Sequence, residues 1–134
     1  MIVLDASVVI ELLLATPTGH LVEQRVRRPL EQMHAPHLLS VEVAHVLRRF
    51  TRVHSLEPAA ADAALTDLAR LRIRRWAHEP LLDRVWQLRA NLSAYDAVYV
   101  SLAERLQAPL LTTDHRMARA GMSTAEIEVV PTIN

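Results

Sequence analysis

The feature of this sequence that most constrains its fold is the alternation of short apolar runs with longer segments of helical pattern. Short apolar runs predict strands at residues 2–4, near His34, and at residues 110–112 and 127–130. Apolar residues at helical spacing predict helices starting at Thr16 and Pro17 and over residues 8–14, 38–52, 55–69, 81–90, 95–106 and 115–120. Strands that alternate with helices predict a parallel sheet covered by helices on both faces.

The length of 134 residues predicts a single domain, 1–134, with one core, and a hydrophobic fraction of 51% is enough to build it. In the segment LRIRRW, Arg70, Arg72 and Arg74 alternate with Leu71 and Ile73. A period of two with one charged face predicts a half-buried strand at the edge of the sheet.

The composition excludes several classes of site. Only Gly19 and Gly121 are glycines, which excludes Gly-rich phosphate loops, and the absence of cysteine excludes disulfides, thiolate zinc sites and a cysteine nucleophile. Aromatic residues make up 4% of the chain, so extended base-stacking platforms are not expected. The net charge is zero, and all the basic side chains are arginines. Arginine suits phosphate, although clusters of this kind are also ordinary solvated faces.

The N-terminal segment MIVLDASVVIELLLA superficially resembles a signal peptide. It has no basic residue ahead of its apolar run, however, and it contains Asp5 and Glu11. No uncharged run approaches the about 20 residues that a membrane helix needs. We therefore expect a soluble cytoplasmic protein that does not enter the membrane.

Four carboxylates interrupt apolar segments instead of lying on polar faces. Asp5 ends the first predicted strand, Asp114 follows the strand at residues 110–112, Asp96 lies in the first turn of an apolar helix, and Glu42 lies in LLSVEVAHVL. In a parallel sheet, the carboxyl ends of the strands and the starts of the following helices share one edge, where ligands bind. The four acids can therefore converge there.

Converging carboxylates repel each other to the point of protonation unless a cation neutralises them. Oxygen ligands without histidine or cysteine favour a hard cation, Mg²⁺ or Mn²⁺, over zinc. Each acid also has an explanation without metal. Asp5 and Asp114 can cap the helices that follow them, Asp96 can form a capping box with Ser93, and Glu42 can reach solvent or Arg49.

Three stretches in order and spacing carry a family resemblance: VLDASVVIELLL, APHLLSVEVAHVLRRF and YDAVYVSLAERLQAPLLTTD. Together they resemble the PIN-domain ribonucleases, most closely the VapC-type toxins of bacterial toxin–antitoxin pairs. The resemblance covers essentially the whole chain. It implies a three-layer α/β/α sandwich with a central parallel sheet and an acidic pocket that binds Mg²⁺ or Mn²⁺.

The resemblance assigns the metal-binding and catalytic positions of the family to the same four acids, Asp5, Glu42, Asp96 and Asp114. It assigns hydroxyl groups that orient ligands or waters to Ser7 and Thr112. The implied chemistry is hydrolysis of RNA by a metal-activated water, with the 3′-oxygen leaving and a 5′-phosphate product. Arg116 is a candidate phosphate contact, with an ordinary surface arginine as the alternative.

The resemblance also implies two protein partners, a cognate antitoxin and a second copy of this chain. It suggests an antitoxin groove near residues 16–28 and 38–52. Two other functions remain open at this point. One is a metal-dependent RNA-binding module with weak or no catalysis, and the other is a phosphatase that acts on small phosphoesters.

Overall fold

A computed structural model describes residues 1–121 and 123–134. Within these residues, the strands form one fully parallel sheet in the order β3-β2-β1-β4-β5. The strands are β1 (Ile2–Leu4), β2 (Met33–Pro36), β3 (Ile73–Trp76), β4 (Leu110–Thr112) and β5 (Ile127–Val129). The parallel sheet predicted from the sequence is confirmed.

The helices connect the strands in the predicted alternating order. They are α1 (Ala6–Leu13), α2 (Pro17–Val26), α3 (Leu38–Arg52), α4 (Pro58–Arg70), α5 (Leu82–Gln87), α6 (Ala94–Leu106) and α7 (His115–Arg119). The largest differences from the prediction are in α4, which begins at Pro58 instead of Ser55, and in α5, which ends at Gln87 instead of residue 90. A 3₁₀ turn, Glu79–Leu81, precedes α5.

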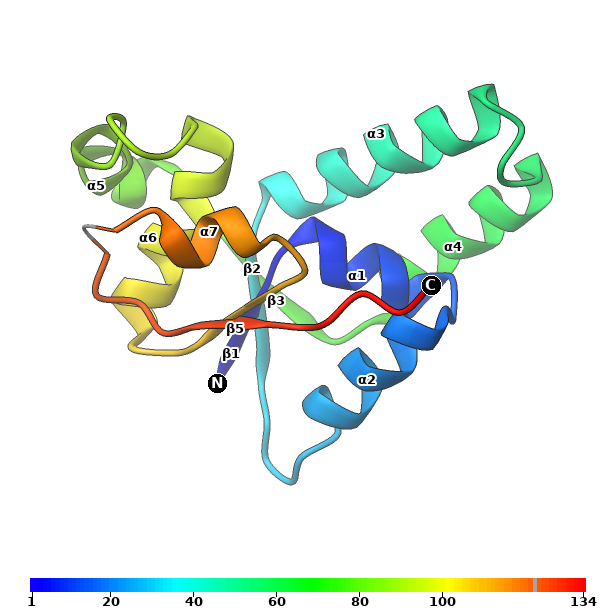
Figure 1. The fold of residues 1–134 in the computed structure, drawn as a ribbon, viewed down its shortest axis with the longest axis horizontal. Coiled ribbons are helices and arrows are strands. Elements are labelled where there is room, and N and C mark those ends of the chain that lie inside the picture. The colour runs from blue at the N-terminus through cyan, green and yellow to red at the C-terminus, as the bar shows by residue number, and fades with distance from the viewer. Residues whose placement is uncertain (122) are drawn as a thin grey trace.

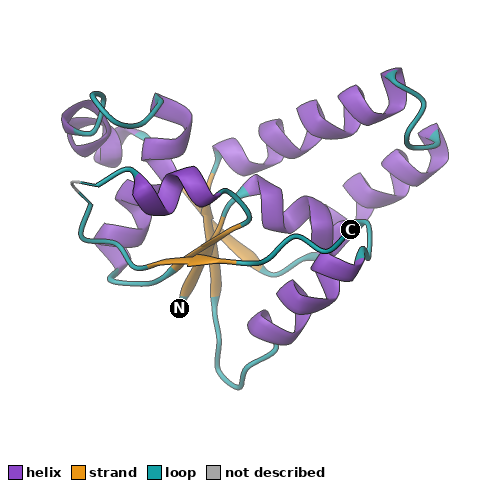
Figure 2. Cartoon of the chain, viewed as in Figure 1, coloured by secondary structure: helices purple, strands orange, loops and turns teal. Residues whose placement is uncertain are grey.

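Two groups of helices cover the two faces of the sheet, which confirms the three-layer arrangement (Figure 2). Alternation along the strands divides the core. Ile2, Leu4 and Leu111 pack on the side of α1 to α4, while Val3 and Leu110 pack on the side of α5 to α7. The two central strands β1 and β4 therefore contribute apolar side chains to both faces, as expected for a buried parallel sheet.

Helix α6 is the most deeply buried helix segment, with every residue from 97 to 103 inside the core. Ser93 caps its first turn by accepting a hydrogen bond from the Asp96 N–H at 3.1 Å, as predicted. The edge position of β3 is also confirmed. The Arg74 guanidinium on this strand lies over the Trp76 ring, 4.5 Å from its centroid.

Helix α1 lies between α2 and α3 and packs against both (Figure 1). Helices α2 and α3 thus share α1 as a neighbour, and α3 also packs against α4. The antitoxin groove near residues 16–28 and 38–52 stays a prediction. An ion-pair network ties α2 to β5, since Arg25 contacts Glu31 at 2.6 Å and Glu128 at 2.7 Å. In the described part of the chain, no helix is long and apolar enough to cross a membrane.

Candidate active site

The order of the strands creates a switch point between β1 and β4. From β1 the chain builds outward through β2 to β3, and it then returns to place β4 on the other side of β1. In open α/β sheets, ligands bind at the carboxyl ends of the strands where the order reverses. Asp5 follows β1 directly, and Asp114 lies two residues beyond the end of β4. Two of the predicted acids thus flank the switch point.

The other two acids come from helices at the same edge. Helices α1 and α3 both begin there, as Figure 1 shows, and Glu42 lies in the second turn of α3. Helix α6 begins at this edge and runs back to the start of β4, so Asp96 in its first turn lies there too. We call Asp5, Glu42, Asp96 and Asp114 the acid cluster.

Two hydroxyl groups hold the carboxylate of Asp5. Ser7 Oγ donates to Asp5 Oδ1 at 2.6 Å, and Thr112 Oγ1 donates to Asp5 Oδ2. The Val8 N–H also donates to Asp5 Oδ1 at 3.3 Å, so Asp5 is the N-cap of α1. The contacts place both hydroxyl residues singled out in the sequence on this one acid. A cap alone would need only the contact to Val8.

The same two hydroxyls tie Asp5 to the loop after β4. Ser7 Oγ accepts from the Thr113 N–H, and Thr112 Oγ1 accepts from the Asp114 N–H, both at 3.0 Å. Side chains that orient an acid and are themselves held by the backbone are typical of a preorganised site.

Burial dominates the electrostatics of Asp5. Its side chain is 7% exposed, and desolvation raises the pKa of Asp5 from 3.8 to about 6, although its hydrogen bonds favour the charged form. Among the described residues, the carboxylate therefore has hydrogen-bond donors but no positive charge that lowers its pKa.

Glu42 has a partner that the sequence did not predict. The buried Tyr99 hydroxyl donates a hydrogen bond to Glu42 Oε1 at 2.6 Å. Arg49, the suggested ion-pair partner of Glu42, instead lies over the Phe50 ring at 5.6 Å. One signal for Tyr99 exists in the sequence, because a tyrosine inside an apolar helix needs a partner for its hydroxyl.

The acids of the cluster influence each other's charge. Burial raises the pKa of Glu42, and the charge of Asp96 raises it further. Burial likewise raises the pKa of Asp96, with a further rise from Asp114, while a hydrogen bond with Ser93 opposes it. The charge of Arg116 also opposes the rise in the pKa of Asp96. These effects indicate that Glu42, Asp96 and Asp114 lie near one another.

Asp114 differs from the other three. It caps α7 by accepting from the Arg116 N–H at 2.8 Å, and the Arg116 guanidinium contacts its Oδ2 at 3.0 Å. This arginine holds the pKa of Asp114 below its usual range. Arg116 itself extends into solvent, with its side chain 87% exposed, so it remains able to contact a phosphate as well.

The donor groups of the acid cluster are those that a divalent cation prefers, but their positions in this structure do not form a complete metal site. Oxygen donors and three raised carboxyl pKa values are what a hard cation would complement. In residues 1–121 and 123–134, however, no three His, Cys, Asp or Glu side chains are positioned to share one metal ion. The Tyr99 hydroxyl occupies only Oε1 of Glu42, whereas Arg116 contacts both oxygens of Asp114. The assignment of metal ligands stays a prediction.

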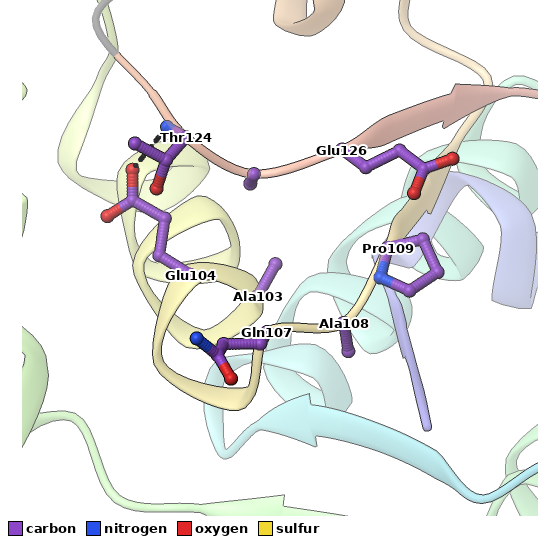
Figure 3. A pocket seen from close by; sticks show the side chains of 8 residues that line it. Ala103, Glu104, Gln107, Ala108, Pro109, Thr124 and Glu126 are labelled. Atoms are coloured by element: carbon purple, nitrogen blue, oxygen red, sulfur yellow. Dashed lines mark hydrogen bonds between the residues drawn. The ribbon is translucent and has the colours of Figure 1, made fainter.

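A separate hollow of about 380 Å³ lies at the opposite edge of the sheet, between the end of α6 and the segment before β5 (Figure 3). Glu104, the acid that α6 contributes to this hollow, already accepts hydrogen bonds from neighbouring residues. Its carboxylate accepts from Arg84 at 2.7 Å, from Ser123 Oγ at 2.9 Å and from the Thr124 N–H at 3.1 Å. This hollow shares no residue with the acid cluster.

The fold and the acidic edge define a protein of the PIN-domain class, since the model of the PIN domain family matches residues 2–122. The chain is 40% identical over 131 residues to ribonuclease VapC9 of Mycobacterium tuberculosis, covering 98% of this chain and 99% of that protein. It is 39% identical over 130 residues to ribonuclease VapC12 of the same species, covering 97% and 99%. The chain belongs to the PIN-domain family and, within it, to the VapC ribonuclease toxins.

A solved structure supports the fold independently. VapBC2 from Rickettsia felis, bound to a DNA fragment from its promoter, matches with a TM-score of 0.70 at 12% sequence identity. The match covers 96% of this chain and 98% of that one. The parallel sheet with flanking helices is therefore the PIN-like fold that the sequence predicted.

Proposed function

We propose that this VapC-type ribonuclease hydrolyses RNA phosphodiester bonds at the acid cluster with Mg²⁺ or Mn²⁺. Asp5, Glu42 and Asp96 would hold the principal cation, and Asp114 would assist. The observation that carries this proposal is the set of three partly or fully buried carboxylates at one edge of the sheet, whose pKa values are raised by burial and which a further positive charge would stabilise in the ionised form. A divalent ion supplies that charge.

When bound, the cation would activate a water molecule and stabilise the leaving oxygen. The side chains of the protein orient the carboxylates and accept a proton. Ser7 and Thr112 fix the direction of the Asp5 carboxylate, and Tyr99 fixes that of Glu42. Asp96 has a raised pKa and is suited to take the proton from the attacking water.

The reaction adds one water across the phosphodiester. The water oxygen bonds to phosphorus, the bond from phosphorus to the 3′-oxygen breaks, and a proton passes to that oxygen. The products are a 5′-phosphate and a 3′-hydroxyl. Arg116 lies at the same edge. It would contact a non-bridging phosphate oxygen through guanidinium N–H groups that are not bonded to Asp114.

Two protein partners belong to the proposal. The similarity to VapBC2, in which toxin and antitoxin form a complex on DNA, supports an antitoxin partner for this chain. A second copy of the chain is the other partner. Helix α5 exposes Leu82 and Trp86, the latter by 68%, and a dimer contact there would bury apolar surface. The cytoplasm stays the predicted location.

The decisive test is cleavage of a mixed pool of structured RNA by the purified protein, free of antitoxin, with Mg²⁺, with Mn²⁺ and with EDTA. We expect cuts that need the metal, that leave 5′-phosphate ends, and that disappear in Asp96→Asn and Glu42→Gln. The matched control is Asp62→Asn, which makes the same chemical change at an exposed position of α4. Normal activity in Glu42→Gln would exclude the proposed set of ligands.

The same purified protein separates the other two functions. Metal-dependent RNA binding without cleavage would identify a binding module. Hydrolysis of p-nitrophenyl phosphate without RNA cleavage would identify a phosphatase. Either outcome would overturn the proposed reaction while leaving the fold and the family unchanged.

A further inference from the structure

A second hollow, of about 480 Å³, borders the acid cluster directly. It lies between α3, the start of α6 and the start of α1, and its walls include Val41, His45 and Tyr95. Glu42 belongs both to its wall and to the acid cluster, and Tyr95 immediately precedes Asp96. The hollow is therefore continuous with the candidate active site.

The residues at the mouth of this hollow are unusually exposed for their type. Tyr95 is 63% exposed and Val41 is 67% exposed. Tyr99, one helical turn after Tyr95 on the same helix, is 2% exposed and bonds to Glu42. One tyrosine of α6 thus positions an acid, while the other presents its ring to solvent beside that acid.

We propose that this hollow receives a nucleobase of the RNA substrate, from a nucleotide next to the scissile phosphate, stacked on the Tyr95 ring. This inference rests on the proposed function. Every base has an aromatic face, so one exposed ring is enough to hold one base without selecting its sequence. The scarcity of aromatic residues excludes an extended stacking platform but leaves room for this single contact.

The charge of α3 favours a nucleic acid as the occupant of the hollow. Val41, His45, Arg48 and Arg52 follow one another at spacings of four, three and four residues, which places them on one face of the helix. The two arginines are exposed and lie one and two turns beyond His45. An RNA strand that leaves the hollow along α3 would bring its phosphates to these guanidinium groups.

An apolar segment of a protein partner would also fit the hollow, but it would gain nothing from the row of arginines. The combination of an aromatic ring, an apolar wall, a neighbouring acid cluster and a cationic continuation matches the alternating base and phosphate of a single strand. A nucleobase is thus the occupant that uses all four features.

The test compares the steady-state kinetics of Tyr95→Ala, Tyr95→Leu and Tyr95→Phe on a short single-stranded RNA that the wild type cleaves. Loss of one stacked base predicts a KM that rises by about 5-fold to 100-fold in Tyr95→Ala, with a smaller change in kcat. Tyr95→Leu keeps apolar volume but no ring, and it should behave like Tyr95→Ala. Tyr95→Phe keeps the ring and should restore KM.

A binding measurement makes the inference independent of turnover. In the Asp96→Asn background, 2-aminopurine is placed at successive positions of the RNA, and its fluorescence is recorded with and without protein. Quenching at one position, lost with Tyr95→Ala and kept with Tyr95→Phe, would support the stacked base. Arg48→Gln with Arg52→Gln should flatten the salt dependence of the same binding curve.

The outcomes distinguish this inference from the proposed function. If the wild type cleaves RNA but Tyr95→Ala has an unchanged KM and no position is quenched, the nucleobase site is wrong and the nuclease stands. If Tyr95→Ala leaves RNA kinetics unchanged but weakens inhibition by the antitoxin, the hollow belongs to the protein partner. If the wild type does not cleave and no RNA position is quenched, both proposals fail.

Discussion

Replacing Asp5 with asparagine should make the metal-free protein more stable at neutral pH. Asp5 is nearly fully buried, and its pKa is raised from 3.8 to about 6 because burial disfavours the charged form. Asparagine has almost the same shape and no charge. Its amide oxygen can still accept from Ser7 and from the Val8 N–H, while the Thr112 hydroxyl can turn to accept from its amide nitrogen.

The size of the effect follows from the pKa difference. Each tenfold change in acid dissociation corresponds to about 1.4 kcal/mol. The rise from 3.8 to about 6 therefore corresponds to about 3 kcal/mol of free energy of unfolding, as an order of magnitude. The stability that a neutral Asp5 confers is fully present below pH 3.8, and it is lost as the pH rises through about 6.

The measurement is a set of urea unfolding curves for wild type and Asp5→Asn in EDTA, from about pH 4 to about pH 7.5. The relevant quantity is the difference in free energy of unfolding between the two proteins at each pH. Burial lowers the pKa of His34, which gives a pH dependence of opposite sign in a nearby range. That contribution is the same in both proteins, so the difference removes it.

We expect the difference to favour Asp5→Asn by about 2.5 kcal/mol more at the upper pH than at the lower one, because the lower pH already lies slightly above 3.8. Saturating Mg²⁺ or Mn²⁺ should reduce this advantage, because the ion stabilises only the protein that retains the carboxylate. A difference that stays constant with pH would refute the reasoning that Asp5 is a buried, uncompensated charge. A pH-dependent difference that metal leaves unchanged would refute its role as a ligand.

Three further predictions concern other contacts. Tyr99→Phe removes the hydrogen-bond donor to Glu42, so the metal concentration needed for half-maximal cleavage should rise about tenfold. The circular dichroism spectrum should be retained. An unchanged metal dependence would contradict the positioning role of Tyr99. Gly19→Ala would drive a Cβ into the Glu11 carbonyl oxygen, so urea unfolding should show a loss of about 3 kcal/mol. An equally stable variant would disprove this close packing of α1 and α2. Arg25→Met leaves the partly buried Glu31 and Glu128 without their shared cation. We expect the free energy of unfolding, measured by the same urea assay, to fall by about 2 kcal/mol at neutral pH and by less in acid.

Local patterns in the sequence were enough to predict most of the secondary structure and to single out the four acids as candidates. The apolar run of β1, the cap at Ser93 and the period-two pattern of β3 depend on neighbouring residues, and the structure confirms each of them. The errors are also local. Helix α5 ends three residues earlier than predicted, at Gln87, and α4 begins at Pro58 instead of Ser55.

The partners of the acids could not be predicted in this way. Glu42 and Tyr99 are 57 residues apart in sequence, and Asp5 and Thr112 are 107 apart. Such contacts depend on which strands become neighbours, and several strand orders would satisfy the same alternation of strands and helices. The sequence therefore indicated the acids but not what holds them in place.

Sequence alone determined the element types, the parallel sheet and the residues that carry charge into apolar segments, because periodicity and burial preference act over a few residues. The tertiary structure decided the strand order, and with it the meeting of β1 and β4 at the acid cluster. It also decided that Tyr99 turns inward to Glu42 while Tyr95 faces solvent. These two tyrosines are one helical turn apart, and only the packing around the start of α6 distinguishes them.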